Sequence, residues 1–210
     1  ADKIKALEQL LTDYPRSDYA DDAMYDIGRA YVLTQQNDAA IAAYNRVLER
    51  FPRTNVARKA ALEIGMLYAN NNDTENAIAA YKEVVNKYPS SEEAKVAIES
   101  MQTIYVDNNR INEYLAYRES IAGSTISTVK KSLEDSLNFA AAERLFMREN
   151  YKEATSSFKN YLTNYCDNQT LNCIAAQYYL AESYYKTGLK DNALTHFAHL
   201  TQLTGNPYQE

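Results

Sequence analysis

Apolar side chains return at intervals of three and four residues along most of this chain, and short polar breaks separate the runs. Between residues 17 and 52, a first stripe ends at Tyr31, a polar break covers 35–38, and a second stripe ends at Phe51. Intervals of three and four place side chains on one face of an α-helix. Pro52 then stops the second run, because proline lacks an amide hydrogen and clashes with the preceding turn. The pattern predicts two helices joined by a turn.

The two-helix unit recurs along the chain. Pairs of an aromatic residue and proline, Tyr14-Pro15, Phe51-Pro52 and Tyr88-Pro89, stand 37 residues apart. The same step relates three further sets of residues: Gly28 and Gly65; Tyr31, Tyr68 and Tyr105; Tyr44 and Tyr81. A fixed period of this size is typical of stacked helical arrays. We therefore expect layered helix pairs rather than one globule with a private pocket.

Small residues recur at one phase of each unit. A glycine within a helix costs about 1 kcal/mol relative to alanine, so its use at both Gly28 and Gly65 indicates a packing reason. We expect these glycines, with Ala40 and Ala77, to let antiparallel helices approach closely while Tyr31 and Tyr44 fill the space between them. We also expect a hydroxyl two residues after each proline to cap the next helix. These residues are Ser17, Thr54 and Ser91.

This arrangement resembles the tetratricopeptide repeat family. The first full copy of the family motif is Met24, Ile27-Gly28, Tyr31, Ala40, Tyr44 and Pro52, and the second is Ala61, Ile64-Gly65, Tyr68, Ala77, Tyr81 and Pro89. The resemblance implies an all-α fold, a right-handed α-solenoid of antiparallel helix pairs with about five repeats and a leading half repeat. Because these proteins present binding surfaces, it also implies a scaffold for a protein or peptide.

The resemblance divides the single solenoid of residues 1–210 into successive segments. These are the second helix of a truncated repeat (1–15), repeats one to three (16–52, 53–89 and 90–124) and two divergent repeats (125–166 and 167–206). Neither end carries the polar cap that repeat arrays normally need. We therefore expect a segment of a longer protein, or self-association through the truncated ends.

The period is longer than the usual 34 residues of the family. The extra residues lie between each proline and the next glycine, where they lengthen the first helix of each unit. This variant resembles repeats of bacterial envelope proteins such as the outer-membrane assembly lipoprotein BamD and the periplasmic partner of the Tol–Pal system. The likeness implies the periplasm or cell envelope of a bacterium, with the cytoplasm as the alternative.

The regular spacing breaks after the third unit. Residues 121–128 lack the proline stop and are expected to form a turn into a longer helix over about 127–149. Two interpretations remain open. The segment is either a local insertion in one array or a bend that separates two sub-arrays.

Charge and composition exclude several classes of function. The net charge is −6 and no basic block is present, whereas a nucleic-acid surface needs clustered Lys and Arg. No run of about 20 apolar residues is present that could span a membrane. The 19 tyrosines against 5 phenylalanines and no tryptophan suit thin helix layers, because a tyrosine can bury its ring and keep its hydroxyl wet.

Candidate chemistry is sparse. Cys166 and Cys173 flank a turn at a spacing that fits no common zinc or redox motif; they are expected either to form a disulfide in an oxidising compartment or to remain unpaired thiols. His196 and His199 lie one helical turn apart, but zinc needs three or four ligands. No phosphate-binding loop or nucleophile elbow is found. We therefore expect no metal, no cofactor and no enzymatic activity.

In this family the first helix of each repeat lines a concave groove. Carried over by position, the groove residues are Tyr25, Arg29, Leu62, Met66, Phe139, Phe146, Tyr178 and Tyr185. Some members grip a terminal carboxylate with Lys and Asn at the positions that Tyr25, Arg29, Leu62 and Met66 occupy here, so that clamp is not supported. The resemblance implies an aromatic wall for an extended or helical peptide, unless these side chains merely pack the inner curve.

We therefore expect a non-catalytic protein- or peptide-binding scaffold in cell-envelope assembly or complex organisation. The alternative is a structural or oligomerisation module within a longer multidomain protein.

Overall fold

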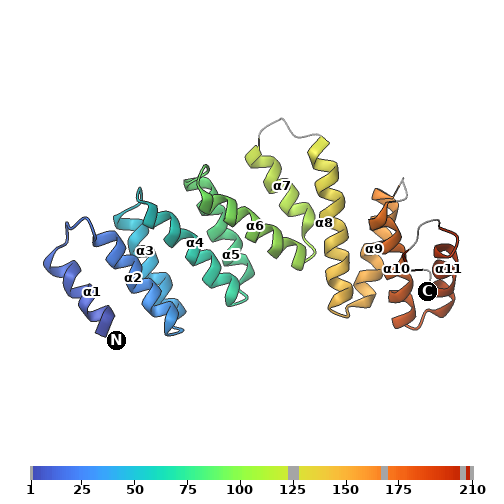
Figure 1. Ribbon diagram of the computed structural model, residues 1–210, viewed down its shortest axis with the longest axis horizontal. Coiled ribbons are helices and arrows are strands. Elements are labelled where there is room, and N and C mark those ends of the chain that lie inside the picture. Colours follow the sequence, from blue (N-terminus) through green and yellow to red (C-terminus); the bar gives the residue numbers. More distant parts are fainter. Residues whose placement is uncertain (1, 123–127, 167–169, 204–206, 209–210) are drawn as a thin grey trace. The chain divides into compact units, whose positions relative to one another are not determined.

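The structure is a computed structural model that describes residues 2–122, 128–166, 170–203 and 207–208. Within these residues every regular element is an α-helix (Figure 1). The helices are α1 (Asp2–Asp13), α2 (Ala20–Leu33), α3 (Asn37–Arg50), α4 (Asn55–Asn70), α5 (Thr74–Lys87), α6 (Glu92–Asp107), α7 (Ile111–Ala122), α8 (Thr128–Met147), α9 (Tyr151–Tyr165), α10 (Leu171–Lys186) and α11 (Lys190–Leu200).

The chain divides into two compact units, residues 1–104 and 105–210, which we call the N-terminal and C-terminal units. In each unit, helices that follow one another in sequence pack together, for example α2 with α3 and α10 with α11. First helices of successive repeats also touch, α2 with α4 and α8 with α10. This confirms the predicted all-α fold of stacked, adjacent helix pairs.

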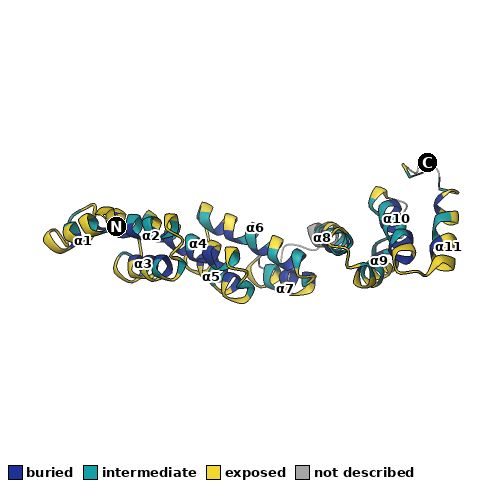
Figure 2. Ribbon diagram, turned by 90° about the horizontal axis from the view of Figure 1, so that it is seen from below, coloured by how far each residue is buried: buried dark blue, intermediate teal, exposed yellow. Residues whose placement is uncertain are grey.

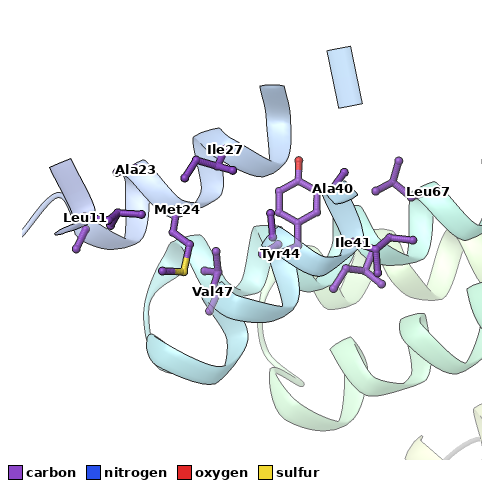
Figure 3. Close-up of a cluster of buried hydrophobic side chains, with 14 residues drawn as sticks. Leu11, Ala23, Met24, Ile27, Ala40, Ile41, Tyr44, Val47 and Leu67 are labelled. Atoms are coloured by element: carbon purple, nitrogen blue, oxygen red, sulfur yellow. The ribbon is translucent and has the colours of Figure 1, made fainter. Parts of the chain in front are cut away.

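The core of the N-terminal unit is a thin layer between its helices. Figure 2 shows α2 and α4 on one side and α3 and α5 on the other, with buried residues where the two layers meet. Leu11, Met24, Ile27, Tyr44 and Val47 converge there from α1, α2 and α3 (Figure 3). Each helix therefore buries one stripe against its immediate neighbours, as the spacing of three and four predicts.

The glycines allow the expected close approach of the paired helices. A Cβ atom built at Gly28 would lie 2.6 Å from Cδ1 of Tyr44, and one at Gly65 would lie 2.6 Å from Cδ1 of Tyr81. Both distances are far below van der Waals contact, so the tyrosine ring occupies the space that any larger residue would need. The packing role predicted for these glycines is confirmed.

Two of the three predicted helix caps form. Thr54 Oγ1 accepts a hydrogen bond from the Ala57 amide at 3.2 Å, and Ser91 Oγ accepts one from the Ala94 amide at 3.1 Å. The prediction for Ser17 is wrong, because its hydroxyl accepts from the Tyr19 amide within a turn. The equivalent donor, the Ala20 amide, instead bonds the Ser17 backbone carbonyl at 3.0 Å. Helix α2 consequently begins only at Ala20.

The C-terminal unit contains the long helix and the cysteine pair. Helix α8 has 20 residues, close to the predicted span of about 127–149, while the predicted turn at 123–127 lies outside the described residues. The division into units falls between Ile104 and Tyr105, within α6, rather than in the 121–128 segment. A disulfide bond joins Cys166, just after α9, to Cys173 in the first turn of α10.

Candidate binding surface

Four of the eight candidate residues lie on α2 and α4 of the N-terminal unit. Tyr25 is half-buried, with its ring centroid 5.3 Å from that of Tyr44, and Leu62 is also half-buried. Arg29 and Met66 are exposed. We call the surface formed by Tyr25 and Arg29 of α2 and by Leu62, Glu63 and Met66 of α4 the N-terminal face.

The Tyr25 hydroxyl donates a hydrogen bond to Oε1 of Glu63 at 3.4 Å and so connects α2 to α4. Burial, followed by the negative charge of Glu63, raises the pKa of Tyr25 to about 12. Burial and then Glu63 also raise the pKa of Tyr44. Both phenols are therefore neutral hydrogen-bond donors near neutral pH.

The Tyr44 hydroxyl is buried and has no hydrogen-bond partner among the described residues. Its counterpart one repeat later is Tyr81, which forms a hydrogen bond with the side chain of Ser100. Burial raises the pKa of Tyr81, and this hydrogen bond offsets part of the rise. The residue at the Ser100 position in the earlier repeat is Glu63, which accepts from Tyr25 instead. A buried donor without a partner is rare in folded proteins. This hydroxyl is therefore a polar group near the N-terminal face whose hydrogen bonding is incomplete.

Glu63 makes no ion pair within the part of the chain that the structure describes. The basic side chains around the N-terminal face pair with other carboxylates: Lys3 and Arg29 with Asp26 at 2.7 and 3.5 Å, and Arg58 with Glu93 at 3.5 Å. The face therefore presents a half-buried carboxylate with no ion-pair partner among the described residues, and Lys59 lies one turn before it on α4.

The other four candidates lie on α8 and α10 of the C-terminal unit. Phe139 packs edge-on against Phe158 and Tyr161, with ring centroids 6.3 and 5.6 Å away. Phe146 lies 4.8 Å from Tyr179 and 5.3 Å from Tyr151. Both phenylalanines are half-buried, so a large part of each ring serves the core of this unit.

Tyr178 is half-buried and Tyr185 is exposed. The ring of Tyr178 stacks on that of Tyr208, with 4.2 Å between centroids and 7° between planes. Tyr185 is 55% exposed. We call the side chains of α8 and α10 around Tyr178, Tyr179 and Tyr185 the C-terminal face.

Sequence reasoning missed a second tyrosine–carboxylate pair on this face. The Tyr179 hydroxyl donates to Oε1 of Glu143 at 3.4 Å, and burial followed by Glu143 raises the pKa of Tyr179. Glu143 also makes no ion pair among the described residues, while the nearby Arg144 and Arg148 both bind Asp107 at 3.0 Å. The available signal was weak: Glu63 and Tyr179 each directly follow a candidate residue, Leu62 and Tyr178.

The histidines do not form a metal site in this structure. Nδ1 of His196 lies 2.7 Å from Nε2 of Gln177, and its ring stacks on Tyr184 with centroids 5.4 Å apart. Burial lowers the pKa of His196, which favours the neutral ring. Across the described ranges, no group of three or more His, Cys, Asp or Glu residues is placed to hold a metal ion.

Among the helices that the structure describes, none is both long and apolar enough to cross a membrane.

The stacked helix pairs define a class of protein, the helical-repeat scaffold. Two models described as tetratricopeptide repeat match the chain, one over residues 4–54 and 25–92 and the other over 175–203. Together the matches cover more than half of the chain. The chain belongs to the tetratricopeptide repeat family, whose members are generally non-catalytic scaffolds for protein–protein interaction.

Solved structures with a similar arrangement are distant in sequence. A crystal structure of MamA protein is 16% identical, with a TM-score of 0.46, and the match covers 89% of this chain and 92% of that one. A tetratricopeptide repeat protein from Parabacteroides merdae is 14% identical, with a TM-score of 0.47 and coverage of 94% and 70%. MamA from Desulfovibrio magneticus is 10% identical, with a TM-score of 0.45 and coverage of 91% and 98%. The comparison with curated proteins gave no match.

Proposed function

We propose that this chain is a non-catalytic scaffold that binds segments of a partner protein at the N-terminal face and, separately, at the C-terminal face. The observation that carries the proposal is the presence of partly exposed aromatic and apolar side chains on the first helices. Met66 is 41% exposed and Tyr185 is 55% exposed, and half-buried Tyr25 and Tyr178 lie on the same two faces. Large side chains of this kind, fixed on rigid helices, are the usual anchors of protein interfaces.

A displayed-peptide selection tests the proposal. Peptides selected on the wild-type chain should bind Met66→Ala or Tyr185→Ala about tenfold more weakly, because each change removes a contact worth more than about 1 kcal/mol. Leu194→Ala is the matched control, since Leu194 is 70% exposed but lies on the second helix α11. Failure to select any peptide, or equal losses in all three variants, would contradict the proposal.

We also propose that the chain works in an oxidising compartment, in envelope assembly or the organisation of an envelope complex. The Cys166–Cys173 disulfide supports this setting, because thiols in the cytosol are kept reduced. The extended period, which resembles that of bacterial envelope proteins, supports it as well. Thiol labelling of the protein isolated from its native cells tests the setting: a blocked pair is expected, and two freely labelled cysteines would exclude it.

A structural role in self-association is the second candidate. It is favoured by exposed leucines away from the two faces, above all Leu194 on α11 and Leu189 just before it. Exposed leucines mark contacts between chains where they join into a contiguous apolar patch. Sedimentation velocity should then show dimers that Leu194→Ala weakens and Tyr185→Ala leaves intact.

A further inference from the structure

The same tyrosine–carboxylate pair occurs on both faces with its partners exchanged. In the N-terminal unit the tyrosine lies on the earlier helix, Tyr25 on α2, and the carboxylate lies on the later one, Glu63 on α4. In the C-terminal unit Glu143 lies on the earlier helix α8 and Tyr179 on the later helix α10. Both hydrogen bonds measure 3.4 Å. The pair therefore occurs twice on first helices, with the tyrosine and the carboxylate at exchanged places.

Both carboxylates retain capacity for a ligand. Each accepts its tyrosine through Oε1, and among the described residues no hydrogen bond reaches Oε2 and no ion pair reaches either group. One long hydrogen bond from a neutral phenol balances little of the charge of a half-buried carboxylate. Glu63 and Glu143 would therefore gain much from a cation supplied by another molecule.

The unpartnered Tyr44 hydroxyl is a second, independent sign of an incomplete site. It is buried, and the Tyr44 ring lies 5.3 Å from the ring of Tyr25, the residue that donates to Glu63. The equivalent hydroxyl of Tyr81 is satisfied by Ser100. The hydrogen-bonding groups around Glu63 are thus arranged for more partners than the free chain provides.

We propose that each tyrosine–glutamate pair is a subsite for a basic side chain, arginine or lysine, of the partner peptide. The inference rests on the proposed function and names the chemistry of the partner. The carboxylate accepts hydrogen bonds from the guanidinium or ammonium group, and the adjacent phenol ring offers its electron-rich face to the same cation. The local arginines form ion pairs with Asp26, Glu93 and Asp107, and among the described residues none of them pairs with Glu63 or Glu143.

The charge of the whole chain favours the same partner. A net charge of −6 attracts basic segments over a distance and repels acidic ones.

The inference is tested with a minimal probe, N-acetyl-arginine amide, titrated into ¹⁵N-labelled protein and followed by NMR. The neutral isostere N-acetyl-citrulline amide is the matched ligand control. Amide shifts around Tyr25 and Glu63, and around Glu143 and Tyr179, are expected with the arginine probe, with a dissociation constant on the order of millimolar. The citrulline probe should leave these amides unshifted.

Glutamine variants assign the two subsites separately. Glu63→Gln and Glu143→Gln keep an oxygen that can accept the tyrosine hydroxyl, so the fold should be preserved, but each should weaken arginine binding at its own subsite about tenfold. Glu49→Gln, an equal change of charge at an exposed position on α3, should have no effect. Equal shifts with citrulline, no shift with arginine, or binding that survives both changes would overturn the inference.

Failure of the inference can be told apart from failure of the proposed function. Selected peptides that depend on Met66 and Tyr185 but carry no basic residue would overturn the inference and leave the scaffold function standing. No selected peptide together with no arginine binding would contradict both.

Discussion

The ring of Tyr44 lies where the side chain of any residue other than glycine at position 28 would have to be. A Cβ atom at Gly28 would stand 2.6 Å from Cδ1 of that ring, and the same relationship repeats between Gly65 and Tyr81. The ring is held between helices on both sides and cannot move away cheaply. This contact sets how closely the two helices of a repeat approach.

We predict that Gly28→Ala lowers the free energy of unfolding by about 1–3 kcal/mol, because overpacking outweighs the gain in helix propensity. Urea denaturation measures the change. In a Tyr44→Ala background the same substitution should become neutral or stabilising, since the obstructing ring is gone and alanine favours the helix. A loss of equal size in both backgrounds would show that the ring does not set the spacing.

Removing the buried Tyr44 hydroxyl should not destabilise the protein. Tyr44→Phe is predicted to be neutral or to raise the free energy of unfolding by about 1 kcal/mol, because an unpaired buried donor carries a desolvation penalty. Tyr81→Phe is the matched comparison and should cost about 0.5–1.5 kcal/mol, because it removes the bond to Ser100. Thermal and urea unfolding of both variants measure the difference, and equal losses would contradict the assignment of Tyr44 as unpaired.

Tyr25 should make the stability depend on pH in alkaline solution. Its pKa is raised from 10.0 to about 12 in the folded chain, so between these values the folded state binds more protons than the unfolded state. The contribution of Tyr25 to stability is therefore fully present below pH 10 and falls as the pH rises towards 12. Urea unfolding across this range should show a smaller decline for Tyr25→Phe than for the wild type. An identical decline would mean that Tyr25 ionises equally easily in both states.

Reduction of the disulfide should destabilise the C-terminal unit. The bond closes a short loop with a sequence separation of 7, so its loss is predicted to cost about 2 kcal/mol. Thermal unfolding with and without reductant measures the effect, and the variant carrying Cys166→Ser and Cys173→Ser is the control because reductant should not change it. A wild-type transition that is insensitive to reductant would contradict the prediction.

The helix caps show that local sequence does not fully determine which hydrogen bonds form at a helix start. Ser17, Thr54 and Ser91 occupy the same place after their prolines, yet only the last two accept the amide three residues on. At Ser17 the backbone carbonyl takes the Ala20 amide instead. Side chain and backbone compete for one donor with similar energies, and the sequence alone does not rank them.

The candidate binding residues show a second property that local sequence does not determine, namely how deeply each side chain is buried. Position in the repeat directed attention to the first helices, but it gave Phe139 and Phe146 the same standing as Tyr185. The structure packs both phenylalanines among other aromatic rings and leaves Tyr185 exposed. How far a first-helix side chain is buried depends on the neighbouring repeat, which the repeat's own sequence does not describe.

By itself, the sequence determined the helix pairs, their period and their stacking, because apolar spacing, proline stops and paired glycines act within or between adjacent helices. Only the tertiary structure decided which polar groups meet on the two faces. The pairs Tyr25–Glu63 and Tyr179–Glu143 join residues 38 and 36 apart, and the local arginines are directed to other carboxylates. Such contacts depend on how one repeat is seated against the next, a relationship set by the packing of whole helices rather than by any short stretch of chain.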